Sequence, residues 1–275
     1  MPIEDAAAYP FIDIALSRRL ERAEASGNAA AVEARAKISP AVGASWIEVA
    51  GAYAMFDGVG SPLTQTFGLG LFKAIGTAEM ERLETFFRER GAAVYHEVSP
   101  LAHPGLVGLL NERGYQPLEF TSVMFRPLGA APITTPQAPI RVRAIRDDEC
   151  DAWTTTAAEG WSELPEVEAF MRDIGRLNTG RADATCFLAE AGGRPIATGV
   201  LSMHDGVALL AGASTIPSGR RQGAQLALLD ARLRFAAGKG CDLAMMCASP
   251  GSASQRNAER HGFRVAYTRL KWQGT

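Results

Sequence analysis

The sequence predicts an α/β (α+β) fold divided into two domains of similar plan. Three observations lead to this prediction. An apolar run at 207–213 enters a turn rich in proline, glycine and arginine, and a helical pattern follows the turn. A similar order of glycines, strands and helices occurs once in each half of the chain. The length of 275 residues exceeds that of an ordinary single domain and suits two domains of about 130 residues.

The two halves of the chain share one pattern of glycines and strands. In the first half, Gly91 precedes an apolar strand that ends in a Ser-Pro pair, and Gly114 follows the next helix 23 positions later. In the second half, Gly240 precedes a similar strand, and Gly262 follows 22 positions later. A shared spacing of this kind predicts two copies of one fold.

The first half begins with a helical pattern. From Phe11 to Ala36 apolar and charged residues recur at helical spacing, which predicts a surface helix. Residues 46–57 and 63–71 are predicted strands that contain several aromatic side chains. Small residues and prolines without charge then indicate an extended connector. The predicted organisation is a domain at 1–127, a linker at 128–138 and a second domain at 139–275.

The second half alternates between strand and helix patterns. We expect strands at 140–145, 186–191, 195–202, 207–215, 242–248 and 264–272. Helical patterns fill the region up to Leu177, the stretch after Gly223 and the stretch that ends at Arg260. Ser252 is suited to cap the last helix, and Gly262 is suited to end it in a left-handed conformation.

The turn from Thr215 to Gln225 predicts a binding site for an anionic cofactor. The first amides of the helix that follows have no partner within the helix, and the helix dipole adds positive potential there. Gly223 lets the backbone approach a ligand closely, and Arg220 and Arg221 supply charge. A Walker loop would need Lys-Ser or Lys-Thr after Gly223, and a dinucleotide fingerprint would need three glycines. Neither pattern is present.

The turn resembles motif A of the GNAT acyltransferase superfamily, Pro-x-x-Arg/Gln-x-x-Gly-x-Gly/Ala. Pro217, Arg220 and Gly223 match this pattern, and Gln225 departs from its last position. The resemblance extends over about residues 139–275. It implies a central mixed, mostly antiparallel sheet flanked by helices in each of two tandem domains. It also implies that the loop amides hold the pyrophosphate of acetyl-CoA, while the splayed strand end pairs with the pantetheine.

The resemblance yields a set of expected cofactor contacts. These are Thr215, Ile216, Pro217, Arg220, Arg221, Gln222, Gly223, Ala224, Gln225, Ser252 and Asn257. In the first half, the corresponding place is occupied by the apolar stretch 67–73, which contains no arginine. We therefore interpret the domain at 1–127 as a degenerate GNAT-like domain that has lost the phosphate loop.

The groups that would carry protons are less clearly marked. Many GNAT enzymes place a tyrosine four residues before a Gly-Phe pair, where this chain has Ala258. Tyr267, Ser254 and Ser252 are the candidate acids, and Glu159 or Glu190 is the candidate base acting through water. The strand-end amides near Thr215 and Ile216 are expected to polarise the thioester carbonyl.

Two functions remain open on the sequence alone. The first is an acetyl-CoA-dependent N-acetyltransferase that acts on a primary amine of a small molecule, with its active site in the second domain. The second is a non-catalytic acyl-CoA-binding sensor or scaffold, which the missing tyrosine favours. The net charge of −2 and the absence of a basic run argue against a nucleic-acid partner.

The remaining expectations concern metals, membranes and cellular location. The four cysteines and four histidines are scattered, so we expect no metal site and a reducing, cytoplasmic environment. No apolar stretch is long enough to span a bilayer, and no signal-peptide pattern begins the chain. We expect a monomer or a homodimer without membrane association.

Overall fold

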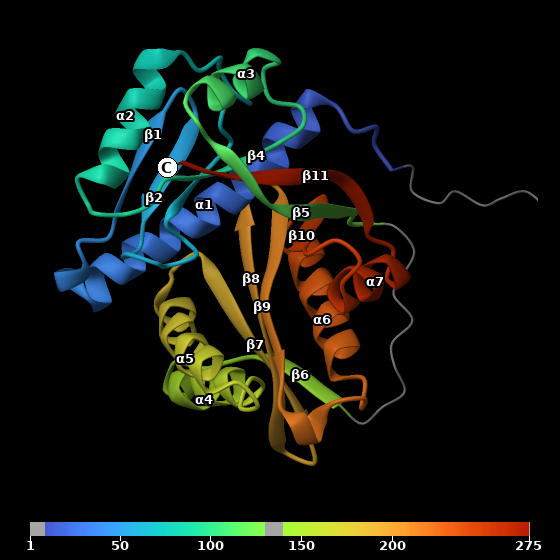
Figure 1. Ribbon diagram of the computed structural model, residues 1–275. Helices are drawn as coiled ribbons and strands as arrows, with labels where there is room; N and C mark the ends of the chain where they lie inside the picture. The colour runs from blue at the N-terminus through green and yellow to red at the C-terminus, as the bar shows by residue number, and fades with distance from the viewer. Residues whose placement is uncertain (1–8, 130–139, 275) are drawn as a thin grey trace, which may run out of the picture. The chain divides into compact units, whose positions relative to one another are not determined.

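The computed structural model describes residues 9–129 and 140–274 of the chain (Figure 1). Contacts divide the chain into two compact units. The first, which we call the central-segment unit, is built mainly from Arg126–Met246. The second, the two-segment unit, combines Pro10–Phe125 with Cys247–Thr275. The C-terminal segment thus belongs to the same unit as most of the first half of the chain. Most of the predicted linker at 128–138 lies outside the described residues, and the predicted domain boundaries stay a prediction.

The two-segment unit is a mostly antiparallel sheet with helices packed against it. Its strands lie in the order β1-β2-β3-β4-β11-β5, and β3 and β4 run parallel. The strands are β1 (Ser45–Val49), β2 (Ala52–Phe56), β3 (Gln65–Phe67), β4 (Tyr95–Val98), β5 (Gln116–Pro127) and β11 (Arg264–Gln273). The helices are α1 (Ile14–Ile38), α2 (Thr77–Arg88), α3 (Gly105–Glu112) and α7 (Ala253–Arg260), with a 3-10 turn at Pro40–Val42.

Two strand predictions in this unit were wrong in detail. The predicted strand at 46–57 is a hairpin of β1 and β2, because Ala50 and Gly51 adopt left-handed φ angles of 51° and 86° and reverse the chain. The predicted strand at 63–71 is reduced to β3, because Gly68 and Gly70 adopt φ angles of 76° and 67° that no strand permits.

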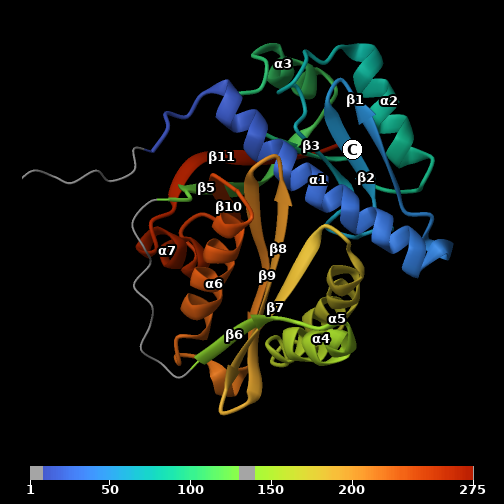
Figure 2. The same cartoon turned by 180° about the vertical axis from the view of Figure 1, so that it is seen from behind.

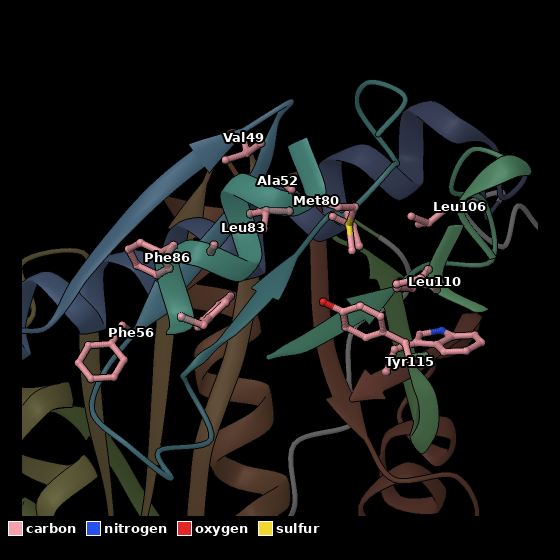
Figure 3. Packing of buried hydrophobic residues seen from close by; sticks show 14 residues of the cluster. Val49, Ala52, Phe56, Met80, Leu83, Phe86, Leu106, Leu110 and Tyr115 are labelled. Carbon is pink, nitrogen blue, oxygen red and sulfur yellow. The ribbon is translucent and has the colours of Figure 1, made fainter. Parts of the chain in front are cut away.

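The main core of the two-segment unit lies between the sheet and the pair α2 and α3 (Figure 3). Helix α2 presents Met80, Leu83 and Phe86 at helical spacing, and all three are buried. They share this core with residues of β2 and α3 and with Tyr115. Burial of a side chain such as Leu83 contributes about 2 kcal/mol to stability. The opposite face of the sheet is covered by α1, which buries Val32 against Met55.

The strands of the central-segment unit lie in the order β10-β9-β8-β7-β6 (Figures 1 and 2). Its pairs are antiparallel except for β9 and β10, which run parallel. The strands are β6 (Ile140–Ala144), β7 (Ala184–Ala191), β8 (Arg194–His204), β9 (Val207–Thr215) and β10 (Leu243–Ala248). The helices are α4 (Cys150–Glu159), α5 (Pro165–Gly180) and α6 (Ala224–Gly238), with 3-10 turns at Asp147–Glu149 and Pro217–Gly219.

Helices α4 and α6 cover opposite faces of this sheet. Cys186 and Leu188 of β7 pack against Trp153 of α4. The intervening Phe187 points to the other face, where its ring meets that of Phe235 of α6 at a centroid distance of 5.4 Å. This alternation follows from the two-residue period of a strand. It places α6 directly behind the strands that carry the predicted cofactor turn.

No helix within residues 9–129 and 140–274 is long and apolar enough to cross a bilayer.

Candidate functional site

The predicted cofactor turn follows β9, which pairs with β10 only along its first residues. Strand β10 pairs with β9 through Leu243–Met245 against Val207–Leu209. Strand β9 continues to Thr215, and no further register with β10 is found along it in the described part of the chain. Ala211 and Ala213 are exposed on this continuation. The end of β9 therefore offers backbone hydrogen-bonding groups to a ligand along one edge.

A bulge interrupts β9 on its other edge, where it pairs with β8. The register passes from Val200↔Ala211 to Thr198↔Ser214, so Gly212 and Ala213 together oppose the single residue Gly199. Gly212 has a left-handed φ of 57°. A Cβ at Gly212 would lie 2.7 Å from Val200 Cγ2, so the backbone approaches its neighbour more closely than any side chain would permit.

The turn itself presents unpaired backbone amides. Gly223, with φ of 83°, precedes α6 and provides no capping side chain. The first hydrogen bond of the helix runs from the Ala227 amide to the Gly223 carbonyl, so the amides of residues 224–226 have no acceptor within the helix. Arg221 adopts a left-handed φ of 62°, a strained conformation for a non-glycine residue. These amides and the helix dipole form a site suited to an anion.

The two arginines of the turn have different surroundings. The Arg220 guanidinium contacts Glu163 Oε2 at 2.9 Å and donates to the Gly160 carbonyl at 3.1 Å. It therefore binds the segment between α4 and α5. Arg221 is exposed, and among the described residues no side-chain partner is found for it. Of the two predicted cofactor contacts, Arg221 is the one whose guanidinium is available to a phosphate.

The unusual Gln225 folds back onto the end of β9. Its Nε2 donates to the Ser214 carbonyl at 3.0 Å and to Thr215 Oγ1 at 2.7 Å. This contact keeps the side chain away from the turn amides, so the departure from the motif leaves them accessible. The Ile216 amide donates to the Ile196 carbonyl at 3.0 Å and is engaged in the sheet. The expected polarising amide at Ile216 is thus already occupied.

Glu159 lies beside the same strand end. It is the last residue of α4, its side chain is 46% exposed, and it lies 3.9 Å from Arg194. The next residue, Gly160, packs so closely that a Cβ there would overlap Ser214 Oγ. Glu159 is therefore held near the end of β9 and remains accessible to water. The alternative base, Glu190, is engaged by Arg143 at 2.7 Å.

Four predicted site residues belong to the two-segment unit. Ser252 caps α7, as predicted, and its Oγ accepts from the Gln255 amide at 3.2 Å. Ser254 is exposed on the first turn of α7, and Asn257 is half-buried on the same helix. Tyr267 lies on β11. Their predicted roles stay predictions.

Tyr267 is buried against a carboxyl group. Only 7% of the residue is exposed, and its hydroxyl donates to Glu21 Oε1 at 2.9 Å. Burial and the nearby Glu21 raise the pKa of Tyr267 well above its usual value. The phenol therefore keeps its proton and serves α1 as a hydrogen-bond partner. No observation in the described residues links it to a thioester.

The sequence analysis missed the buried ionic cluster around Tyr267. The Arg269 guanidinium lies 3.3 Å from Glu21, 2.6 Å from Glu24 and 3.4 Å from Glu97. Burial raises the pKa of Glu21 to about 7, and Arg269 opposes this shift in part. A signal was present, because Glu21 and Glu24 share one face of the predicted helix. The strand that supplies Arg269 could not be assigned to that helix from sequence.

Residues 142–263 match the sequence model of the acetyltransferase (GNAT) family. A GCN5-related N-acetyltransferase from Kribbella flavida is 20% identical, with 89% of this chain and 95% of that chain covered and a TM-score of 0.62. One from Sphaerobacter thermophilus is 18% identical, with 76% and 71% covered and a TM-score of 0.54. A tandem GNAT protein from the clavulanic acid biosynthesis pathway is 13% identical, with 81% and 78% covered and a TM-score of 0.53.

A comparison with curated proteins found no match. The similarity to the three solved structures shows the fold, and the family match covers the turn, the bulge and Glu159. The resemblance predicted from Pro217, Arg220 and Gly223 is confirmed. The chain has the fold of these GCN5-related N-acetyltransferases, and its residues 142–263 match the acetyltransferase (GNAT) family model.

Proposed function

We propose that this protein is an acetyl-CoA-dependent N-acetyltransferase that transfers an acetyl group to a primary amine of a small molecule, with its active site in the C-terminal half. One observation carries the proposal. The amides at the start of α6 have no acceptor within the helix, and they follow the turn after β9. The last residues of β9 no longer pair with β10. An anionic head and an extended, amide-bearing tail are the two parts of coenzyme A that suit this pair of features.

The cofactor would be held mainly by the backbone. The amides of residues 221–226 would bind the pyrophosphate, with the exposed Arg221 beside them. The pantetheine amides would pair with the open edge of β9 beyond Leu209, where no register with β10 is found in the described residues. Ser252 and Asn257 on α7 are further proposed contacts. Arg220 would act indirectly, because its guanidinium binds Glu163 and Gly160.

The reaction requires few groups from the protein. The amine nitrogen attacks the thioester carbon, an N–C bond forms, and the C–S bond breaks as the thiolate of coenzyme A leaves. Backbone amides near the bulge of β9 would stabilise the oxygen as it gains charge. Glu159 would take the proton of the amine through water. Ser254 and Tyr267 remain the proposed donors to the thiolate, and the burial of Tyr267 favours Ser254.

We further propose that the chain is a tandem of two GNAT-like domains and that the first has lost the cofactor. In the first half, a Cβ at Gly70 would lie 2.9 Å from Leu106 Cδ2, so the Leu106 side chain fills the space beside this glycine. At the start of α2, Glu79 Oε2 accepts from the Gly76 amide at 2.9 Å. The helix start is thus capped by the chain's own carboxylate, which disfavours a second anion. The described cysteines are free thiols, which favours a cytoplasmic location.

Thiol release from acetyl-CoA with a panel of small amines tests this function. We expect release that depends on the amine, a product heavier by one acetyl group, and loss of both in Gly223→Val. Gly192→Val, which places the same side chain at another left-handed glycine with open space around it, is the matched control and should remain active. Tight binding of coenzyme A without acetylation of any amine would favour the non-catalytic sensor instead. Absence of binding would contradict both.

A further inference from the structure

We propose that Arg232 is a positioning residue that fixes the bulge of β9 and thereby the backbone that faces the acyl group. The inference rests on the proposed function. From the middle of α6, the Arg232 guanidinium reaches both strands at the bulge. Its Nη1 donates to the Val200 carbonyl at 3.0 Å and to the Ala211 carbonyl at 3.1 Å. Its Nε donates to the Leu228 carbonyl one turn earlier in the helix at 3.2 Å.

The charge of Arg232 has no anionic partner. Only 3% of the residue is exposed, and in the described part of the chain no carboxylate forms an ion pair with it. Burial lowers the pKa of Arg232 to about 10, so the group is still protonated at neutral pH. A buried charge without a counter-ion is costly, and here carbonyl oxygens alone compensate it. Core packing alone would not favour an arginine at this position.

Gly199 makes room for this contact. A Cβ at Gly199 would lie 2.9 Å from Arg232 Cζ and 3.0 Å from Nη1, so the guanidinium rests against bare backbone. At the bulge itself, a Cβ at Gly212 would lie 2.7 Å from Val200 Cγ2, so this glycine permits the close approach of β9 to β8. The residues around the guanidinium are therefore fitted to one another on both strands.

The contact determines where the amide of the bulge points. The Ala211 carbonyl and the Gly212 N–H belong to one planar trans peptide, so they point in opposite directions. When Arg232 binds the Ala211 oxygen, it directs the Gly212 N–H away from α6. We place the carbonyl oxygen of the bound thioester against this N–H. Without Arg232, a two-against-one bulge has several accessible backbone arrangements.

Three variants separate this role from simple packing. Arg232→Met removes the charge, and Arg232→Lys keeps the charge but loses the fork that bridges two carbonyls. Arg234→Lys is the matched control on the same helix, because the Arg234 side chain is 61% exposed and pairs with Asp230. The readouts are the affinity for acetyl-CoA by calorimetry, kcat and KM, and the infrared carbonyl stretch of bound acetyl-CoA labelled with carbon-13.

We expect the wild type and Arg234→Lys to lower the stretching frequency of the bound carbonyl. Both Arg232 variants should lose this shift and about 100-fold in kcat, while the affinity for acetyl-CoA changes by less than about 3-fold. If Arg232→Met does not fold, Gly199→Ala displaces the guanidinium from the strand side and should give the same loss.

The outcomes distinguish two kinds of failure. A wild-type chain that binds no acetyl-CoA overturns the proposed function and this inference with it. Binding and a shifted carbonyl that persist in Arg232→Lys and Gly199→Ala overturn this inference alone. A loss of affinity equal to the loss of kcat would assign Arg232 to the general stability of the site and also contradict the positioning role.

Discussion

Arg220 and Arg221 are neighbours in one turn, yet their side chains have different contacts. Arg220 binds Glu163 and the Gly160 carbonyl, which lie 57 and 60 positions earlier in the chain. Arg221 remains exposed in a strained left-handed conformation. A backbone strain of this kind is retained where a function requires it. We therefore propose that Arg221 makes the direct charge interaction with a bound phosphate.

This difference leads to a prediction for two matched alanine variants. Arg221→Ala should weaken the binding of coenzyme A by about 10-fold, because a charge-assisted hydrogen bond is lost. Arg220→Ala should weaken it by less than about 3-fold, because only the support from Glu163 is removed. Calorimetry at low and high salt measures both. The Arg221 effect should shrink at high salt, and a larger effect from Arg220→Ala would reverse the assignment.

At this scale the sequence predicts backbone chemistry better than side-chain partners. The need for glycine at position 223 follows from local geometry, and the structure places Gly223 in the left-handed region. The partners of Arg220 and Tyr267 are distant in sequence, and no local pattern encodes them. Arg232 was not predicted for the same reason, since its acceptors are carbonyls on two strands.

At the scale of elements, the end of α4 is fitted to the end of β9. Ser214 Oγ donates to the Ala157 carbonyl at 2.8 Å, and Gly160 lies against Ser214 without space for a Cβ. The candidate base Glu159 lies between these two contacts. The distance from Glu159 to any bound thioester therefore depends on this junction of helix and strand.

Gly160→Ala tests the junction. The added methyl group must displace the end of β9 or the end of α4, so we expect a destabilisation of about 1–3 kcal/mol and a fall in kcat. Gly238→Ala, on the last residue of α6 with open space around it, is the control and should change neither quantity. Thermal unfolding and thiol release measure the effects. Normal activity in Gly160→Ala would show that the junction does not position Glu159.

Helix α1 introduces a dependence of stability on pH. The pKa of Glu21 rises from its ordinary 4.5 to about 7 in the folded chain, so the folded state holds a proton that the unfolded chain releases. Its contribution to stability is present below the unfolded pKa and is lost as the pH rises to about 7. Burial lowers the pKa of His96 from 6.5 to about 3. That group favours unfolding as the pH falls below 6.5, so its slope has the opposite sign.

Glu21→Gln removes the contribution of Glu21 to the pH dependence of stability and should leave the opposite contribution of His96. Between about pH 4.5 and pH 7, the stability of the wild type relative to the variant should fall by an amount on the order of 3 kcal/mol. Urea unfolding across this range measures the difference. A constant difference between the two chains would show that Glu21 does not hold a proton in the folded state.

Element prediction succeeded where strand and helix patterns were long. The predicted strand 207–215 has the same bounds as β9. Ser252 caps the start of α7, and Gly262 follows its end in a left-handed conformation, as expected. It failed at the hairpin of β1 and β2, because the apolar residues Val49, Ala50 and Ala52 continue the strand pattern through the turn. The short β3 was overestimated, because Gly68 and Gly70 end it within an apolar stretch.

For the whole molecule, the sequence indicates a repeat, but it does not indicate that the C-terminal segment belongs to the same compact unit as residues 10–125. The pattern of Gly91 and Gly114 against Gly240 and Gly262 concerns local order along the chain. The structure adds that β11 pairs with β4 and β5 in the two-segment unit. Pairing between distant strands depends on tertiary contacts, which one sequence does not encode in any local pattern. The predicted boundary at 128–138 stays a prediction.

The central claim is that main-chain amides at the start of α6 hold the diphosphate of one coenzyme A. Amide resonances of the full chain labelled with nitrogen-15, followed during titration with coenzyme A, test it most directly. We predict that the amides of residues 221–226 shift and saturate at one equivalent, while those at the start of α2, residues 76–79, do not move. Saturating coenzyme A without shifts at 221–226, or with equal shifts at 76–79, would contradict the account.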